Sequence, residues 1–389
     1  MKINSNSISS KGNFAARILS TILLVFNFMN ANASSSEEGA EFNAGEMIAH
    51  HLQDAHSIHL FGHVSVPLPV ILYTDHGVDM FMSSCFWGPN HELITYTSSS
   101  TGNTYELHHE KIHIVDPTPV ATDSTHLEML QHAGDVHAAV PASDHHAHHT
   151  LIDFSITKSV LGMLIIMGIM LWIFISVAKA YNRRPGQAPK GLQNALEPLI
   201  LFIKDEVAVP ALGKKKALVF LPFLLTVFFF IWMCNMLGLI PLGGFNVTGT
   251  LSITLVLAGL VFIITSVKGN AHYWGHIFWP PGVPLFVKVI LVPIEVASLF
   301  IKPAVLMIRL TANINAGHIV ILAFTSLIFI FGAKSEALGM GVGILATAFL
   351  VFMYFLELLV AFLQAYVFTL LAALYFGDAT QEHHHEEHH

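Results

Sequence analysis

Five apolar runs after residue 158 are long enough to cross a lipid bilayer. Residues 159–178, 217–240 and about 251–267 approach the roughly 20 residues that a spanning helix needs. Residues 284–331 and 336–376 are much longer, so each must be tilted, bent or partly surface-lying. Because the chain is 53% hydrophobic and only 11% charged, we predict an all-α membrane protein with five transmembrane helices, the last two long and tilted.

The first 33 residues have the pattern of a secretory signal peptide. Basic residues precede an apolar run of residues 18–29, and the segment ends in Ala31, Asn32 and Ala33. A membrane anchor is the alternative, but about 12 apolar residues are too few to span. Residues 34–150 are therefore expected to be exported. Short β-forming runs at 65–73, 95–97 and 112–116 predict a small β-containing segment, which ends in a histidine-rich linker.

The distribution of basic residues predicts the orientation of the helices. The first span, within residues 151–185, is followed by the basic residues Lys179, Arg183, Arg184 and Lys190, which places its end in the cytoplasm. Residues 186–216 include an amphipathic stretch that is expected to lie along the inner surface. Spans two and three (217–280) and a long helical hairpin (281–378) follow, which leaves the His/Glu tail (379–389) in the cytoplasm.

A stripe of polar residues runs through the fourth apolar stretch. Lys288, Glu295, Lys302 and Arg309 are spaced seven residues apart, which keeps them on one slowly drifting helix face, and Asn313 joins them. An uncompensated charge at mid-bilayer costs about 3 kcal/mol or more, so such residues usually mark an ion path. The two lysines can instead snorkel to an interface. Arg309 lies too far inside the run for that, and its guanidinium stays protonated.

A second polar set is formed by His318, Glu357 and Gln364. His318 lies nine residues after Arg309 and therefore faces another surface of the same helix. Glu357 and Gln364 share one face of the last helix. Across a hairpin turn at residues 332–335, His318 and Glu357 reach the same depth only if the helices are staggered. Such a pair suits a proton relay, and a neutral structural pair is the alternative.

Residues 301–318 and 357–368 closely resemble subunit a of the F-type ATP synthase. Residues 235–241 and 245–252 support the resemblance, which covers about residues 155–378. It implies an inner-membrane subunit without a cofactor, whose Arg309 faces the carboxyl group of the rotating c-ring and separates two aqueous half-channels. The implied partners are the c-ring, the subunit b stalk, the remaining Fo subunits, membrane lipid and transported protons.

The resemblance also assigns the remaining polar residues. It places His318, Glu357 and Gln364 near the periplasmic half-channel, and Glu295 and Ser298 near the cytoplasmic one. Some members have an acid at the first of these positions and a histidine at the second, so this chain carries the exchanged pair. Thr311 and Ala312 replace the usual Phe-Gly.

Other functions find less support in the sequence. A secondary transporter for an anionic substrate would use the same stripe, but no paired Gly- or Pro-interrupted spans indicate inverted repeats. The zinc-protease pattern H-E-x-x-H at residues 109–113 lies in a predicted strand, whereas that chemistry needs a helix. Weak metal binding or proton buffering is a further alternative for the histidine-rich residues His137, His145, His146, His148 and His149. No phosphate-binding loop and no basic nucleic-acid-binding segment occurs, so this chain alone is not expected to hydrolyse ATP.

Overall fold

The computed structural model describes residues 52–61, 64–88, 92–108, 110–115, 151–183, 185–240 and 245–381, together with Gly45 and Ile48. The predicted signal segment, the histidine-rich linker with His145, His146, His148 and His149, and the last eight residues lie outside this range. The chain divides into two compact units, an N-terminal unit of residues 55–58 and 66–158 and a helical unit that holds residues 159–389.

The N-terminal unit contains two three-stranded antiparallel sheets. In the first, β3 (Pro69–Thr74) lies between β4 (Gly77–Met82) and β8 (Ile152–Asp153); in the second, β6 (Thr104–His108) lies between β5 (Tyr96–Thr97) and β7 (Lys111–Val115). The 3-10 helix η1 (Ser83–Phe86) also belongs to it, whereas the two-stranded sheet of β1 (Ser57–Phe61) and β2 (Val64–Pro67) lies mostly in residues 59–65, which group with the helical unit. Alternate residues of the strands, including Val70, Leu72, Tyr105 and Ile112, form its core. The predicted β-containing region is confirmed.

The described part of the H-E-x-x-H pattern, residues 110–113, lies in the turn before β7 and in β7 itself. Glu110 has a positive φ of 60° at the turn, and His113 belongs to β7. Successive side chains of a strand point to opposite faces, so this backbone cannot present the pattern as one helical face. The prediction that residues 112–116 form a strand rather than a protease helix is confirmed for 112–115.

One buried carboxylate accepts hydrogen bonds from four side chains in this unit. Asp79 on β4 is fully buried and accepts hydrogen bonds from the hydroxyls of Ser98 (2.5 Å), Ser100 (2.6 Å), Tyr105 (2.5 Å) and Thr101. Burial alone would raise the pKa of Asp79, but the four donors outweigh it and lower the pKa to about 2. The carboxylate therefore remains charged at neutral pH.

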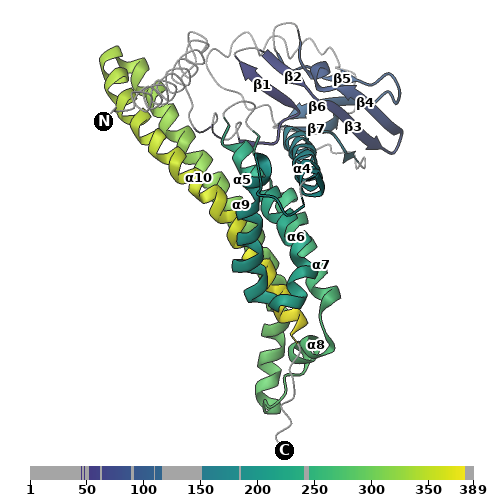
Figure 1. The fold of residues 1–389 in the computed structure, drawn as a ribbon. Coiled ribbons are helices and arrows are strands. Elements are labelled where there is room, and N and C mark those ends of the chain that lie inside the picture. Colours follow the sequence, from purple (N-terminus) through teal and green to yellow (C-terminus); the bar gives the residue numbers. More distant parts are fainter. Residues whose placement is uncertain are drawn as a thin grey trace, which may run out of the picture. The chain divides into compact units, whose positions relative to one another are not determined.

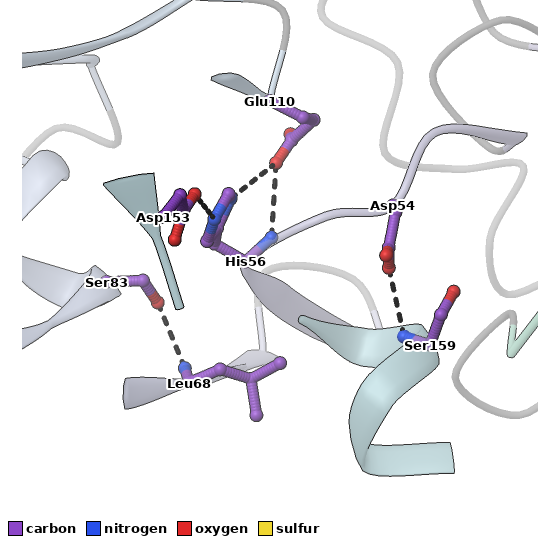
Figure 2. Close-up of polar contacts among 7 residues, drawn as sticks. All are labelled: Asp54, His56, Leu68, Ser83, Glu110, Asp153 and Ser159. Atoms are coloured by element: carbon purple, nitrogen blue, oxygen red, sulfur yellow. Dashed lines mark hydrogen bonds and ion pairs between the residues drawn. The ribbon is translucent and has the colours of Figure 1, made fainter. Parts of the chain in front are cut away.

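A buried histidine joins the ends of this unit (Figure 2). The His56 ring lies 3.5 Å from Asp153 Oδ2 through Nε2 and 4.0 Å from Glu110 Oε2 through Nδ1, and its backbone N–H donates to the same Glu110 oxygen. Burial raises the pKa of Asp153, but the His56 ring and Ser155 outweigh this and lower it. The contacts attach Asp153, five residues before the first long helix, to a residue almost 100 positions earlier.

The helical unit contains all five predicted spans (Figure 1). Its elements are α4 (Lys158–Arg183), α5 (Leu192–Phe202), the π-helix η2 (Ile203–Ala208), α6 (Val209–Gly238), α7 (Leu251–Lys268), α8 (Ala271–Phe278), α9 (Leu285–Lys334) and α10 (Glu336–Thr380). The short helix α8 was not predicted. Each of the five candidate spans is long and apolar enough to cross a membrane.

The amphipathic segment is continuous with the second span. Residues 192–238 are helical throughout except for Gly213, whose φ of 75° breaks the regular geometry. Ile203 and Val207 are fully buried while Asp205 and Glu206 are exposed, which confirms the amphipathic pattern. α6 begins at Val209, eight residues before the apolar run of the second span. Its regular part follows the break at Gly213 and starts with Lys214, Lys215 and Lys216.

The two longest helices form an antiparallel hairpin. α9 ends at Lys334, and the Ser335 hydroxyl accepts a hydrogen bond from Leu338 N as the N-cap of α10. Figure 1 shows α9 and α10 running side by side along most of their length. At about 1.5 Å per residue, the 50-residue α9 is roughly 75 Å long, far more than the hydrocarbon thickness of about 30 Å. α10 also packs against α6, and α7 packs against α9.

Candidate functional site

The stripe of charged residues on α9 meets different surroundings along the helix. Lys288 Nζ lies over the Trp279 ring at 4.1 Å, a cation–π contact. Lys302 Nζ lies 3.9 Å from Asp378 Oδ2 and over the Tyr375 ring. Arg309 is exposed, and among the described residues its guanidinium forms no ion pair or hydrogen bond. Lys302 thus has an acidic partner and Lys288 an aromatic one within the chain, whereas Arg309 projects outward.

The outward face around Arg309 is otherwise nearly free of charge. Ile308 is 55% exposed, and Ala312 and Asn313 are also exposed. On the opposite face of this part of α9, Leu306, Leu310 and Ile314 are buried in the helix core. The interior at the level of Arg309 is therefore largely apolar, and the charge is presented at the surface of the bundle.

About two helical turns beyond Arg309, the Glu357 carboxylate lies against Gly317. A Cβ atom placed on Gly317 would approach Glu357 Oε1 to 2.3 Å, so the Glu357 carboxylate lies directly on the α9 backbone beside His318. The His318 ring lies in turn against Gly238 at the end of α6. Glu357 and Gln364 are both buried, and they share one face of α10 as predicted. The stagger of the hairpin brings His318 and Glu357 to the same depth.

A chain of amide and hydroxyl groups surrounds this end of the helices. Thr248 Oγ1 donates to Asn235 Oδ1 (2.6 Å), and Asn235 Nδ2 donates to Ala361 O (3.0 Å). Asn246 Nδ2 donates to Asn315 Oδ1 (2.7 Å), and Asn315 Nδ2 donates to Gly249 O (3.1 Å). These bonds connect α6, the loop before α7, α9 and α10. The sequence analysis assigned no role to these residues, although buried amides within apolar runs are a recognisable signal.

A second polar region lies at the opposite end of the α9 stripe. The Ser298 hydroxyl donates to Glu295 O (2.7 Å), one helical turn from the Lys302 side chain. A small cavity next to Lys302 is lined mainly by apolar groups, including Val261, Phe262, Leu299 and Pro303, and also by Thr265, Ser266, Tyr273, Lys302 and Tyr375. Burial and then the charges of Asp378 and Glu295 raise the pKa of Tyr273. Asp378 had not been selected from the sequence, because its proximity to Lys302 depends on the hairpin.

Comparison with known proteins gives a decisive match for the helical unit. A family model described as the ATP synthase A chain matches residues 160–377, more than half of the chain. The chain belongs to the ATP synthase A chain family. The matched range contains α6 to α9 and most of α10, and it ends one residue before Asp378.

Several curated relatives in the ATP synthase A chain family are similar over the same region. "ATP synthase subunit a" of Pelodictyon phaeoclathratiforme is 42% identical over 243 residues, which is 61% of this chain and 69% of the relative. "ATP synthase subunit a 2" of Chlorobaculum tepidum is 45% identical over 235 residues, 59% of this chain and 64% of the relative. "ATP synthase subunit a" of Chlorobium phaeobacteroides is 38% identical over 296 residues, 69% of this chain and 85% of the relative.

The N-terminal unit matches a different family model. Residues 47–137 match a domain of unknown function, DUF8433. The ATP synthase A chain match begins only after this region. The family therefore gives no account of what the two small sheets do.

Proposed function

We propose that the chain is the proton-channel stator subunit of an F-type ATP synthase, with two aqueous half-channels separated at Arg309. The observation that carries the proposal is the division of polar groups along α9. His318 lies about 13 Å beyond Arg309 along the axis, and Glu295 about 21 Å before it. At the level between them the interior side of the helix carries Leu306 and Leu310. Protons that reach either polar region must therefore leave the subunit on the Arg309 face.

The electrostatics of Arg309 require a partner outside the chain. An exposed guanidinium on a membrane-facing surface costs about 3 kcal/mol or more without compensation. A carboxylate on a neighbouring membrane subunit would remove that cost, and the family resemblance identifies it as the acid of the c-ring. The ionised acid is stable only beside Arg309, whereas its protonated form can travel through lipid. Arg309 thus lowers the pKa of that acid and promotes proton release.

The His318 end is suited to deliver or accept protons. In the described part of the chain, Glu357 Oε2 is buried and has no hydrogen-bond partner. A buried acceptor of this kind is normally satisfied by water or by a proton. The amides of Asn235, Asn246 and Asn315 supply further hydrogen-bonding groups beside it. Together with Gln364, they support a polar passage that ends at the Glu357 carboxylate.

The Glu295 end supports the second half-channel. Glu295, Ser298 and the small cavity beside Lys302 lie on the same side of Arg309 along α9. The Lys302 and Asp378 side chains are both partly exposed, so this region is open to hydration. We assign it to release or uptake of protons on the side opposite His318.

The basic helix ends support the orientation of these two passages. The Lys216 ammonium donates to Thr380 O, and Asn270 N donates to Ala379 O (2.9 Å). The start of α6, the end of α7 and the end of α10 therefore meet at one end of the unit, where Lys214, Lys215 and Lys268 also lie. Under the positive-inside rule this end faces the cytoplasm. His318 then opens toward the periplasm, and residues 34–150 are exported.

The proposal is tested with Arg309→Ala in the assembled ATP synthase. ATP-driven proton pumping into membrane vesicles should be abolished, while the c-ring, detected as a small acid-bearing proteolipid, still co-purifies with the chain. Ile308→Ala, one residue away on the same exposed surface, is the matched control and should pump normally. Normal pumping by Arg309→Ala would overturn the role of Arg309. Absence of a c-ring with the unaltered chain would overturn the assignment and favour the anion transporter.

A further inference from the structure

The two sheets of the N-terminal unit have unlike outward faces. In the sheet of β5, β6 and β7, the side chains that point away from the core are mostly polar: Thr104, Glu106, His108, Lys111 and His113, with the half-buried Val115 as the exception. In the sheet of β4, β3 and β8 they are apolar, and Met80 is 71% exposed, Val78 53%, Tyr73 51% and Ile152 47%. A uniform solvent environment would favour polar residues on both faces.

The apolar side chains form a continuous surface. The antiparallel register places Tyr73 opposite both Val78 and Ile152, and Ile71 opposite Met80. Pro69 is opposite Met82, which is 43% exposed. Side chains on one face of neighbouring strands lie about 5 Å apart, so they touch across all three strands. Contiguous exposed apolar surface of this kind marks an interaction site.

This surface is joined to a membrane-spanning helix by almost no intervening chain. Phe154, 64% exposed, continues the outward face of β8, and its N–H donates to Ile71 O (2.8 Å). Ile156 N donates to Pro69 O (3.1 Å), so pairing with β3 persists to two residues before α4. Only residues 155–157 lie between Phe154 and Lys158, so the Cα atoms of these two residues are at most about 15 Å apart.

The first residue of α4 takes part in the hydrogen bonds of the N-terminal unit. Lys158, the first residue of α4, is buried, and its backbone N–H donates to Ala55 O (3.0 Å). The α4 helix is one of the five candidate spans. The apolar face can therefore reach any bilayer that α4 crosses.

We propose that this apolar face rests on the outer-leaflet interface of the membrane that α4 crosses. The face comprises Ile71, Tyr73, Val78, Met80, Met82, Ile152 and Phe154. It presents aromatic, methionine and branched aliphatic side chains and no charged group, a composition suited to the boundary between headgroups and acyl chains. A lipid surface needs no complementary charge or matched shape, whereas a specific protein partner usually adds polar contacts at the rim. The polar face of the second sheet then remains in water.

The proposal is tested by measuring which solvent each face meets. In full-length chain assembled in the ATP synthase and reconstituted in phospholipid vesicles, Cys85→Ser and Cys234→Ala remove the two native thiols. Nitroxide labels are then placed at Met80→Cys or Val78→Cys, and at Glu106→Cys as the matched control on the polar face. Collision rates are measured with oxygen, which concentrates in lipid, and with a water-soluble nickel chelate.

The ratio of oxygen to nickel collisions should be at least several-fold higher at positions 78 and 80 than at 106. Adding Met80→Glu to the Val78→Cys chain should reduce the ratio toward that of position 106. Met80 is mostly exposed, so these substitutions remove little core packing. Equal nickel access at positions 80 and 106 would overturn the proposal in favour of open solvent. Low access to both reagents at position 80 would overturn it in favour of a protein partner.

Discussion

The Glu357 carboxylate lies against the backbone of Gly317, close enough that a methyl group on Gly317 would come within 2.3 Å of Glu357 Oε1. The contact joins the two longest helices at the depth of His318. The atoms that a methyl group on Gly317 would meet belong to the buried carboxylate of Glu357, at the end of the proposed polar passage. The absence of a side chain at position 317 therefore determines where that carboxylate lies. Glycine there is required by close approach rather than by backbone conformation.

Gly317→Ala is therefore expected to displace the Glu357 carboxylate and to lower ATP-driven proton pumping at least tenfold. The added methyl group must push the carboxylate aside or separate α9 from α10. Pumping is measured in vesicles with a pH-sensitive dye, alongside the amount of subunit in the purified complex. Gly343→Ala in the same hairpin is the control, since its Cβ would meet Ile328 at an ordinary 3.8 Å. Equal pumping by the two variants would contradict the proposed position of the acid.

The exchanged His318 and Glu357 pair predicts a specific pattern of rescue. Glu357→Gln should reduce passive proton conduction through the membrane sector at least tenfold, because the amide cannot take up and release a proton. The double variant His318→Glu with Glu357→His restores one acid and one base at the same depth, so it should conduct better than either single exchange. Conduction is measured on vesicles stripped of the catalytic sector. A double variant no better than the singles would show that the order of the pair matters.

The buried carboxylate of Asp79 predicts how the N-terminal unit responds to acid. Its pKa falls from an ordinary 3.8 to about 2 in the folded state, so the unfolded state binds the proton more tightly. The resulting stabilisation is complete above pH 4, amounts to roughly 2 kcal/mol, and disappears as the pH falls toward 2. Burial and the Asp79 hydrogen bond raise the pKa of Tyr105 above 10.0, so its contribution is lost only at higher pH.

Asp79→Asn should therefore accelerate amide exchange in β4 and β6 at pH 7, and the difference from the unaltered chain should shrink in acid. Hydrogen exchange with mass spectrometry on the full-length, detergent-solubilised chain measures both effects. Asp75→Asn, at the exposed turn before β4, is the matched control and should leave exchange unchanged. If amide exchange in Asp79→Asn matched that of the control, the four hydroxyl groups that donate to Asp79 would contribute no net stabilisation.

The ion pair of Lys302 with Asp378 is expected to matter more for transport than for stability. Both side chains are substantially exposed and 3.9 Å apart, and such pairs contribute about 0–1 kcal/mol. Asp378→Asn should leave the amount of assembled subunit unchanged but slow ATP synthesis by a few-fold. The reason is that Lys302 loses the carboxylate that neutralises it next to the small cavity. Glu206→Gln, exposed on η2, is the control. Loss of assembly would assign Asp378 a structural role instead.

Periodicity and run length predicted the helices, but they could not predict the contacts between them. The seven-residue spacing identified the α9 stripe, and apolar length identified the hairpin. Neither reports that Asn246 meets Asn315, 69 residues later, or that Lys302 meets Asp378. Strand β8 was missed because two residues carry no alternation signal. The strand with which they pair, β3, also lies more than 75 residues earlier in the chain. Polar groups inside apolar runs indicate a site, whereas their partners depend on packing.

The buried leucines of α9 give the subunit the character of an electrical insulator. Leu306 and Leu310 fill the interior where the two polar regions approach each other most closely, and both are almost completely buried. In the proposed function, a packing defect there would let water link the two regions without any turn of the c-ring. The membrane would then discharge as it does in the presence of an uncoupler, so under this proposal the energy yield of each proton depends on how well two apolar side chains exclude water.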